Sequence, residues 1–149
     1  MVDRLNIQVL PKSMARQRFA RAHELLTEAK LAVTGGRYEA ALLCAVHSGR
    51  AVCDAVTLLL AGEHSTHAEH HHAVDLMLEH GTNLPEVVVR ADYMQRLINH
   101  LSAEHDLTDR VARGEHTNGM ISIAAHLVDW ARELLMKTSF EDEEPVAAG

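Results

Sequence analysis

Apolar residues recur along this chain three and four positions apart, the spacing that places them on one face of an α-helix. Two glycines, Gly35 and Gly36, follow the segment 12–33, and Gly62 follows the segment 38–61, as expected where a helix ends in the left-handed conformation. The second segment is apolar around much of its circumference, which is typical of a covered helix. The pattern predicts a long first helix and a central second helix. The apolar positions of the first are Phe19, Ala22, Leu26, Ala29 and Val33.

Two further helices are marked by residues that favour helix starts and ends. Thr66 and Glu69 form a capping-box pattern before a helix that should end at Gly81. A fourth helix should begin near Pro85, where the missing N–H costs nothing, and continue to about Leu101. Each segment carries apolar residues at helical spacing, so each is predicted to contribute one face to a core.

The segment 108–119 is polar, charged and interrupted by two glycines, which predicts a loop. A last helix is then expected to begin at a cap formed by Thr117 or Asn118. Its two apolar stripes predict two packing partners. A weak alternation typical of a strand is found at Leu5, Ile7 and Val9.

These elements predict an all-α protein, an up-and-down bundle of about five helices. The bundle should form one domain at residues 12–140, since a chain of 149 residues can bury a single hydrophobic core. Residues 1–11 would be an N-terminal extension. Residues 141–149 are acidic and lack periodicity, so we expect a disordered tail.

The charge balance narrows the classes of partner. The formal net charge of −7, from 14 basic and 21 acidic residues, argues against general DNA binding through counterion release. The chain has no run of 18 apolar residues and no signal-peptide pattern, so we expect a soluble cytoplasmic protein without a membrane partner. Cys44 and Cys53 lie about 13 Å apart along one predicted helix, too far for a disulfide. No motif indicates a cofactor.

Histidine is frequent, with 12 residues, five of them between positions 64 and 72. His67 and His71 are four residues apart, so on a helix they would share a face and could supply two ligands to zinc, nickel or copper. Together with His64 they form a candidate metal site. The alternative is a solvated, His-rich helix start that takes up metal adventitiously.

Two other groups of polar residues are candidates for a site. His47 and Asp54 are one heptad apart on the central helix, which is typical of a structural polar pair, with a functional role as the alternative. Arg96, His100 and His105 lie within three helical turns and could bind a phosphate or another ligand, with the histidines as proton carriers. The alternative for this second group is a helix end with its normal share of charge.

The order of these motifs resembles the HEPN family of helical domains (higher eukaryotes and prokaryotes nucleotide-binding). The similarity spans roughly residues 15–138. It depends on the Gly-Gly-Arg-Tyr-Glu-Ala-Ala sequence at 35–41, the His-rich third helix and the Ala-Glu-His-Asp sequence at 103–106. Relatives often have a tyrosine where this chain has His105.

The resemblance implies a choice of functions. Ribonucleases of the family carry an arginine followed four to six residues later by a histidine near the last helix, and Arg110 and His116 match this spacing. Val111 stands where those enzymes commonly have asparagine, and members without the full motif are taken as non-catalytic.

The leading prediction is therefore a non-catalytic module that forms a homodimer. Its partner would be a nucleotidyltransferase-type protein, a nucleotide or RNA, in a context like that of toxin–antitoxin systems. A metal-independent ribonuclease and a His-rich metal-binding bundle are the alternatives.

Overall fold

The computed structural model describes residues 2–103 and 109–138, so His105 and the tail 141–149 lie outside the described residues. Within these ranges the α-helices are α1 Ala15–Thr34, α2 Tyr38–Ala61, α3 His70–Gly81, α4 Pro85–Ala103 and α5 Arg110–Lys137. Two short strands, β1 Ile7–Val9 and β2 Glu63–Ser65, pair antiparallel. Single 3-10 turns, Arg4–Asn6 and Lys12–Met14, lie on either side of β1.

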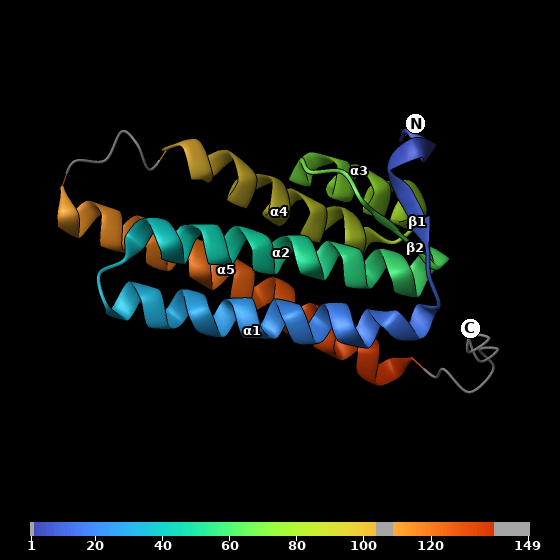
Figure 1. Ribbon diagram of the computed structural model, residues 1–149, viewed down its shortest axis with the longest axis horizontal. Coiled ribbons are helices and arrows are strands. Elements are labelled where there is room, and N and C mark those ends of the chain that lie inside the picture. The colour runs from blue at the N-terminus through green and yellow to red at the C-terminus, as the bar shows by residue number, and fades with distance from the viewer. Residues whose placement is uncertain (1, 104–108, 139–149) are drawn as a thin grey trace.

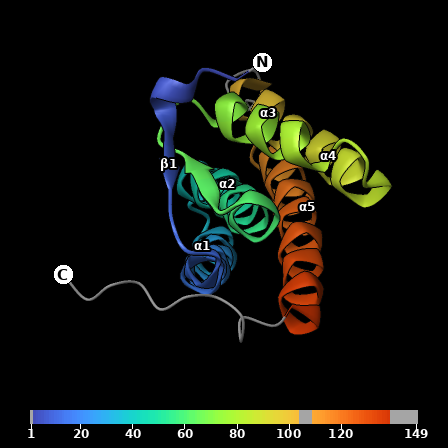
Figure 2. The same cartoon turned by 90° about the vertical axis from the view of Figure 1, so that its right-hand side faces the viewer.

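The helices form an up-and-down bundle with α2 at its centre, and the predicted all-α class is confirmed. In Figure 1 the four long helices α1, α2, α4 and α5 alternate in direction along the molecule. The shorter α3 packs on α2 and α4. Figure 2 shows α2 enclosed by α1, α5 and the α3–α4 pair, and α2 contacts all four of these helices.

The hydrophobic pattern of the first two helices accounts for their packing. The predicted apolar stripe of α1 is buried in the core or packs against it. Gly36, with φ of 74°, and Gly62, with φ of 68°, take the left-handed conformation after α1 and α2. Both predicted helix ends are therefore confirmed.

The start of the third helix differs from the prediction. Residues 63–65 form β2, a strand that the sequence pattern did not predict, and α3 begins at His70 without a side-chain cap. Thr66 does not cap a helix, because α3 begins four residues later, and the Thr66 N–H instead donates to the carbonyl of Asn6 at 2.8 Å. Pairing with β1, which contains part of the weak alternation at 7–9, therefore overrides the local capping signal.

A buried carboxylate connects the strand pair to α3. Glu63 accepts hydrogen bonds from both terminal nitrogens of Arg4, at 3.0 and 2.9 Å, and contacts Nε2 of His80. The hydrogen bonds from Arg4 are the main reason that the pKa of Glu63 lies below its usual range. Since a buried charge requires such partners, this network fixes the N-terminal extension against the bundle.

The predicted loop at 108–119 is wrong from residue 110 onward, because these residues form the first turns of α5. Asp109 is the N-cap, and its side chain accepts a hydrogen bond from the N–H of Val111 at 3.0 Å. Gly114 lies close to Tyr38, whose hydroxyl oxygen would be 3.2 Å from a Cβ at that position. This glycine therefore permits close packing within a helix and does not mark a loop.

The composition of α2 fits its position in the core. By length and composition α2 could cross a membrane, and about two thirds of its most apolar 18-residue stretch is buried inside the bundle. The core helix of a bundle and a membrane span share this composition. Cys44 and Cys53 are both free thiols on this helix.

The helix start at Asp109 is testable by unfolding in urea. We expect Asp109→Ala to lower the free energy of unfolding by about 1 kcal/mol, because it removes the cap. Asn118→Ala is the control, and it should be neutral or slightly stabilising, since Asn118 is exposed within α5 and alanine has the higher helix propensity. A loss of stability in Asn118→Ala alone would place the helix start where the sequence pattern predicts it.

Candidate functional site

A pocket of about 260 Å³ lies between α1, α2, β2 and the start of α3. Three arginines line it, although the chain as a whole has a formal net charge of −7. A group of titratable side chains around one hollow is a candidate site. The charged or titratable residues of its wall are Arg18, Arg21, His47, Arg50, Asp54, His64 and His70.

Helix periodicity brings these side chains to the pocket. Arg18 and Arg21 are three residues apart, so they occupy neighbouring positions on one face of α1. His47, Arg50 and Asp54 follow each other at spacings of three and four on α2. Arg18 is half-buried and Arg21 is exposed, and neither forms an ion pair with an acidic side chain in residues 2–103 or 109–138. Their donors are therefore available to a ligand.

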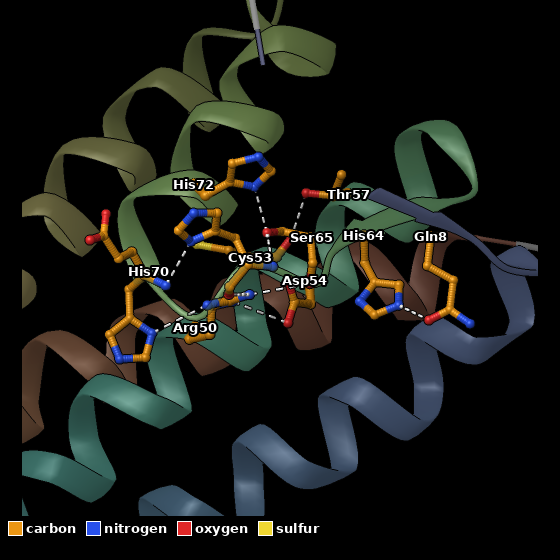
Figure 3. Close-up of polar contacts among 11 residues, drawn as sticks. Gln8, Arg50, Cys53, Asp54, Thr57, His64, Ser65, His70 and His72 are labelled. Atoms are coloured by element: carbon orange, nitrogen blue, oxygen red, sulfur yellow. Dashed lines mark hydrogen bonds and ion pairs between the residues drawn. The ribbon is translucent and has the colours of Figure 1, made fainter. Parts of the chain in front are cut away.

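Arg50 is held in one position by several partners. Its Nη2 donates to the carbonyls of Ser65, at 3.2 Å, and His67, at 2.9 Å. Its Nε lies 3.4 Å from a carboxylate oxygen of Asp54. Figure 3 shows Arg50 between Asp54 and His70 at the point where α2 meets the chain after β2. The guanidinium group is thus a fixed positive charge on the pocket wall.

The two histidines at the α2–α3 contact are neutral near pH 7. The rings of His47 and His70 meet edge to face, with centroids 4.9 Å apart. Partial loss of hydration at this contact is the main cause that lowers the pKa of His47 and lowers that of His70 to about 4. Nδ1 of His70 lies 3.5 Å from Nη1 of Arg50, and because a guanidinium only donates, this nitrogen accepts. His70 therefore carries its hydrogen on Nε2.

His64 is buried, with 6% of its surface exposed, and joins the pocket to the N-terminal strand. Its Nε2 lies 3.0 Å from Oε1 of Gln8, and because an amide oxygen only accepts, Nε2 carries the hydrogen. Nδ1 therefore carries a lone pair, and it has no hydrogen-bond partner among the described residues. Figure 3 shows the His64 ring between Gln8 and Asp54.

Asp54 is the one carboxylate on the described wall of the pocket. Burial raises its pKa to about 6, against the opposing effects of Arg50 and Arg18. Above that pH three guanidinium charges face one carboxylate. The pocket therefore carries an excess of positive charge and is suited to an anion.

The structure places the predicted pair His47 and Asp54 on the same pocket wall, although they contact different neighbours. Sequence reasoning missed Arg50, which lies between them at helical spacing, and this spacing was the signal that could have found it. It also missed Arg18 and Arg21. Nothing in the sequence places these arginines opposite α2, because helix periodicity does not identify the neighbouring helix.

The candidate metal ligands are not brought together. His64 faces the pocket, the ring of His67 stacks on that of His72 with centroids 5.0 Å apart, and His71 lies beside Gln95 of α4. In the part of the chain that the structure describes, no group of three or more His, Cys, Asp or Glu side chains is arranged to hold a metal ion. This arrangement gives no support to a His-rich metal site.

The remaining predicted residues lie around the contact between α4 and the start of α5. The rings of His100 and His116 are 5.3 Å apart, and Nε2 of His116 lies 3.4 Å from the carbonyl of His100. Arg110 lies over the ring of Tyr38, at 5.7 Å from its centroid. Arg96 is exposed and pairs with a carboxylate one turn earlier on α4. The structure thus joins His100 to His116 and leaves Arg96 in a separate ion pair.

Comparisons with known proteins identify no family. No protein-family model, no curated protein and no solved structure gives a significant match to this chain. The resemblance to the HEPN family depends on the short motifs quoted above and on their order along the chain.

Proposed function

We propose that this protein is a non-catalytic, HEPN-like binding module that holds a phosphate-bearing ligand, such as a nucleotide, in the pocket lined by Arg18, Arg21 and Arg50. We call this the arginine pocket. The observation that carries the proposal is the convergence of three guanidinium groups on one hollow of an acidic protein. Guanidinium groups bind phosphate oxygens through paired, charge-assisted hydrogen bonds.

The size of the arginine pocket favours the charged end of a ligand. Its volume of about 260 Å³ is slightly below the range of ligand sites, which measure roughly 300–1,000 Å³. Arg50 is fixed and Arg18 is half-buried, whereas Arg21 is exposed. A phosphate group would therefore lie against Arg18 and Arg50, with the rest of its molecule near Arg21.

The nucleophiles near the pocket, Ser65 and Cys53, are buried, which supports binding over catalysis. The hydroxyl of Ser65 lies 2.6 Å from Nδ1 of His72 and accepts a hydrogen bond from the N–H of His67 at 3.2 Å. In Figure 3 His72 lies on the opposite side of Ser65 from Arg50. Cys53 is fully buried, and burial strongly raises the pKa of its thiol. Ser65 therefore stabilises the turn before α3.

Calorimetric titration with inorganic phosphate and AMP tests the arginine pocket. We expect Arg18→Ala to weaken the affinity for both ligands about tenfold or more, because each lost hydrogen bond to a charged group costs roughly 1.5–3 kcal/mol. Arg21→Ala should have a smaller effect, since Arg21 is exposed.

The matched control for this titration is Arg96→Ala. Arg96 is an exposed arginine outside the pocket, paired with Asp92, and is itself a candidate phosphate ligand from the sequence. Unchanged affinity in Arg96→Ala is expected. If Arg96→Ala weakens binding and Arg18→Ala does not, the phosphate binds on α4 and the proposed pocket is wrong.

A homodimer is the second part of the proposal. Exposed apolar side chains around the start of α4 support it, because Leu84, just before the helix, and Val88 and Val89, on its first turns, are each 38–46% exposed. Light scattering at micromolar concentration should give about twice the chain mass of 16.5 kDa. Val88→Lys should shift the mass to that of a monomer, whereas Val111→Lys, at another exposed valine, should not. A monomeric wild type would exclude the dimer.

A metal-independent ribonuclease is the second candidate function, and the contact between His100 and His116 favours it. Two adjacent imidazoles could serve as acid and base, and Arg110 could hold the scissile phosphate.

RNA cleavage in EDTA by tag-free protein separates the two functions. We expect no cleavage by the wild type and no difference in His116→Ala. Cleavage by the wild type that is lost in His116→Ala, with an unchanged circular dichroism spectrum, would replace the binding module with a ribonuclease.

A further inference from the structure

Asp54 gives the arginine pocket an uncommon feature, a carboxylate inside a site suited to anions. Its side chain is 13% exposed and lies 3.4 Å from Nε of Arg50. His64 adds a second acceptor, because its buried Nδ1 has a lone pair and no partner in the described structure. A fully ionised anion would be repelled by the Asp54 carboxylate. A ligand that also carries a hydrogen-bond donor would instead be attracted.

Phosphates differ from sulfate and from phosphodiesters because they can carry a hydroxyl proton near neutral pH. Inorganic phosphate keeps at least one hydroxyl proton throughout the neutral pH range. A phosphomonoester has its second pKa near 6, so part of it carries a P–OH group close to neutral pH. Sulfate and phosphodiesters carry no such proton there. A carboxylate accepts a hydrogen bond from P–OH but can only repel an unprotonated oxyanion.

We propose that Asp54 selects oxyanions that carry a hydroxyl proton, so that the ligand of the arginine pocket is inorganic phosphate or a phosphomonoester and is neither a sulfate nor a phosphodiester. This inference depends on the proposed function of the pocket. The P–OH donates to Asp54, and Nδ1 of His64 is the alternative acceptor. The unprotonated oxygens accept from Arg18 and lie against Arg50, whose charge also balances the carboxylate.

The selection should depend on pH through Asp54. Its pKa is about 6, so below that pH the carboxyl gains a proton and its repulsion of sulfate is lost. Sulfate should therefore bind more tightly as the pH falls from neutral to about 5. The other charged or titratable groups around Asp54 come from α1, α2, β2 and α3, and they are Arg18, Arg21, His47, Arg50, His64 and His70.

Protonation of the pocket histidines changes anion affinity in the same direction as protonation of Asp54. His70, with a pKa of about 4, stays neutral over this range. Burial from water lowers the pKa of His47 and of His64, so each gains a proton only below its ordinary range, and any added positive charge favours every anion. Asp54→Asn keeps these histidines and removes the carboxylate, so it separates the two contributions.

The test is calorimetric titration of the full chain with inorganic phosphate, glycerol phosphate, sulfate and dimethyl phosphate. At neutral pH the wild type should bind the first two about tenfold or more tightly than the last two. Asp54→Asn should bind sulfate about as tightly as phosphate, and sulfate binding should lose much of its pH dependence. Tighter binding of glycerol phosphate than of inorganic phosphate would identify a phosphomonoester as the ligand class, and the reverse would identify free phosphate.

The outcomes distinguish this inference from the proposed function. Equal affinity of the wild type for phosphate and sulfate, with both lost in Arg18→Ala, would overturn the selection by Asp54 and leave the phosphate site standing. Absence of binding of all four anions would overturn both. If Asp54→Asn unfolds, the preference of the wild type for phosphate over sulfate decides instead, because protonated histidines favour both anions. That preference should shrink as the pH falls below about 6, and a preference that stays constant contradicts the inference.

Discussion

The pocket depends on the contact of one buried guanidinium group with the backbone that follows β2. The Arg50 side chain is 14% exposed on the central helix, where an unpartnered charge would cost several kcal/mol. It finds partners in the carbonyls of Ser65 and His67 and in Asp54. These bonds determine the course of the chain between β2 and α3. They also leave a positive charge in a fixed position beside open space.

The N-terminal extension belongs to the same arrangement. β1 pairs with β2, and the contact of Gln8 with His64 sets which nitrogen of that histidine carries the hydrogen. The bonds of Arg4 and His80 to Glu63 hold the strand pair on the bundle. A segment with no buried residue at positions 2–11 thus determines the hydrogen-bonding character of one pocket wall.

Close packing of α1 against α2 supplies the opposite wall. Small residues such as Ala22 and Ala45 are fully buried at this contact, and the Ser48 hydroxyl donates to the carbonyl of Ala22 at 2.7 Å. Alanine and serine allow two helix backbones to approach closely. The same approach brings Arg18 and Arg21 across from α2. Partial loss of hydration lowers the pKa of His47 and of His70, so these rings stay neutral near pH 7 while the arginines remain charged.

By itself the sequence determined the helices whose apolar residues repeat at three and four, and the ends marked by Gly36 and Gly62, because helix periodicity and the left-handed conformation of glycine are local properties. It also placed His47 and Asp54 on one helix face.

Tertiary structure decided the strand at 63–65, since its partner lies far away in the chain. Tertiary structure also decided the start of α5. Gly114 by itself favours a loop, but it lies within the helix, where the absence of a side chain lets Tyr38 approach. Tertiary structure decided the arginine pocket as well, because periodicity defines the face on which a side chain lies, and packing alone selects the helix that this face meets.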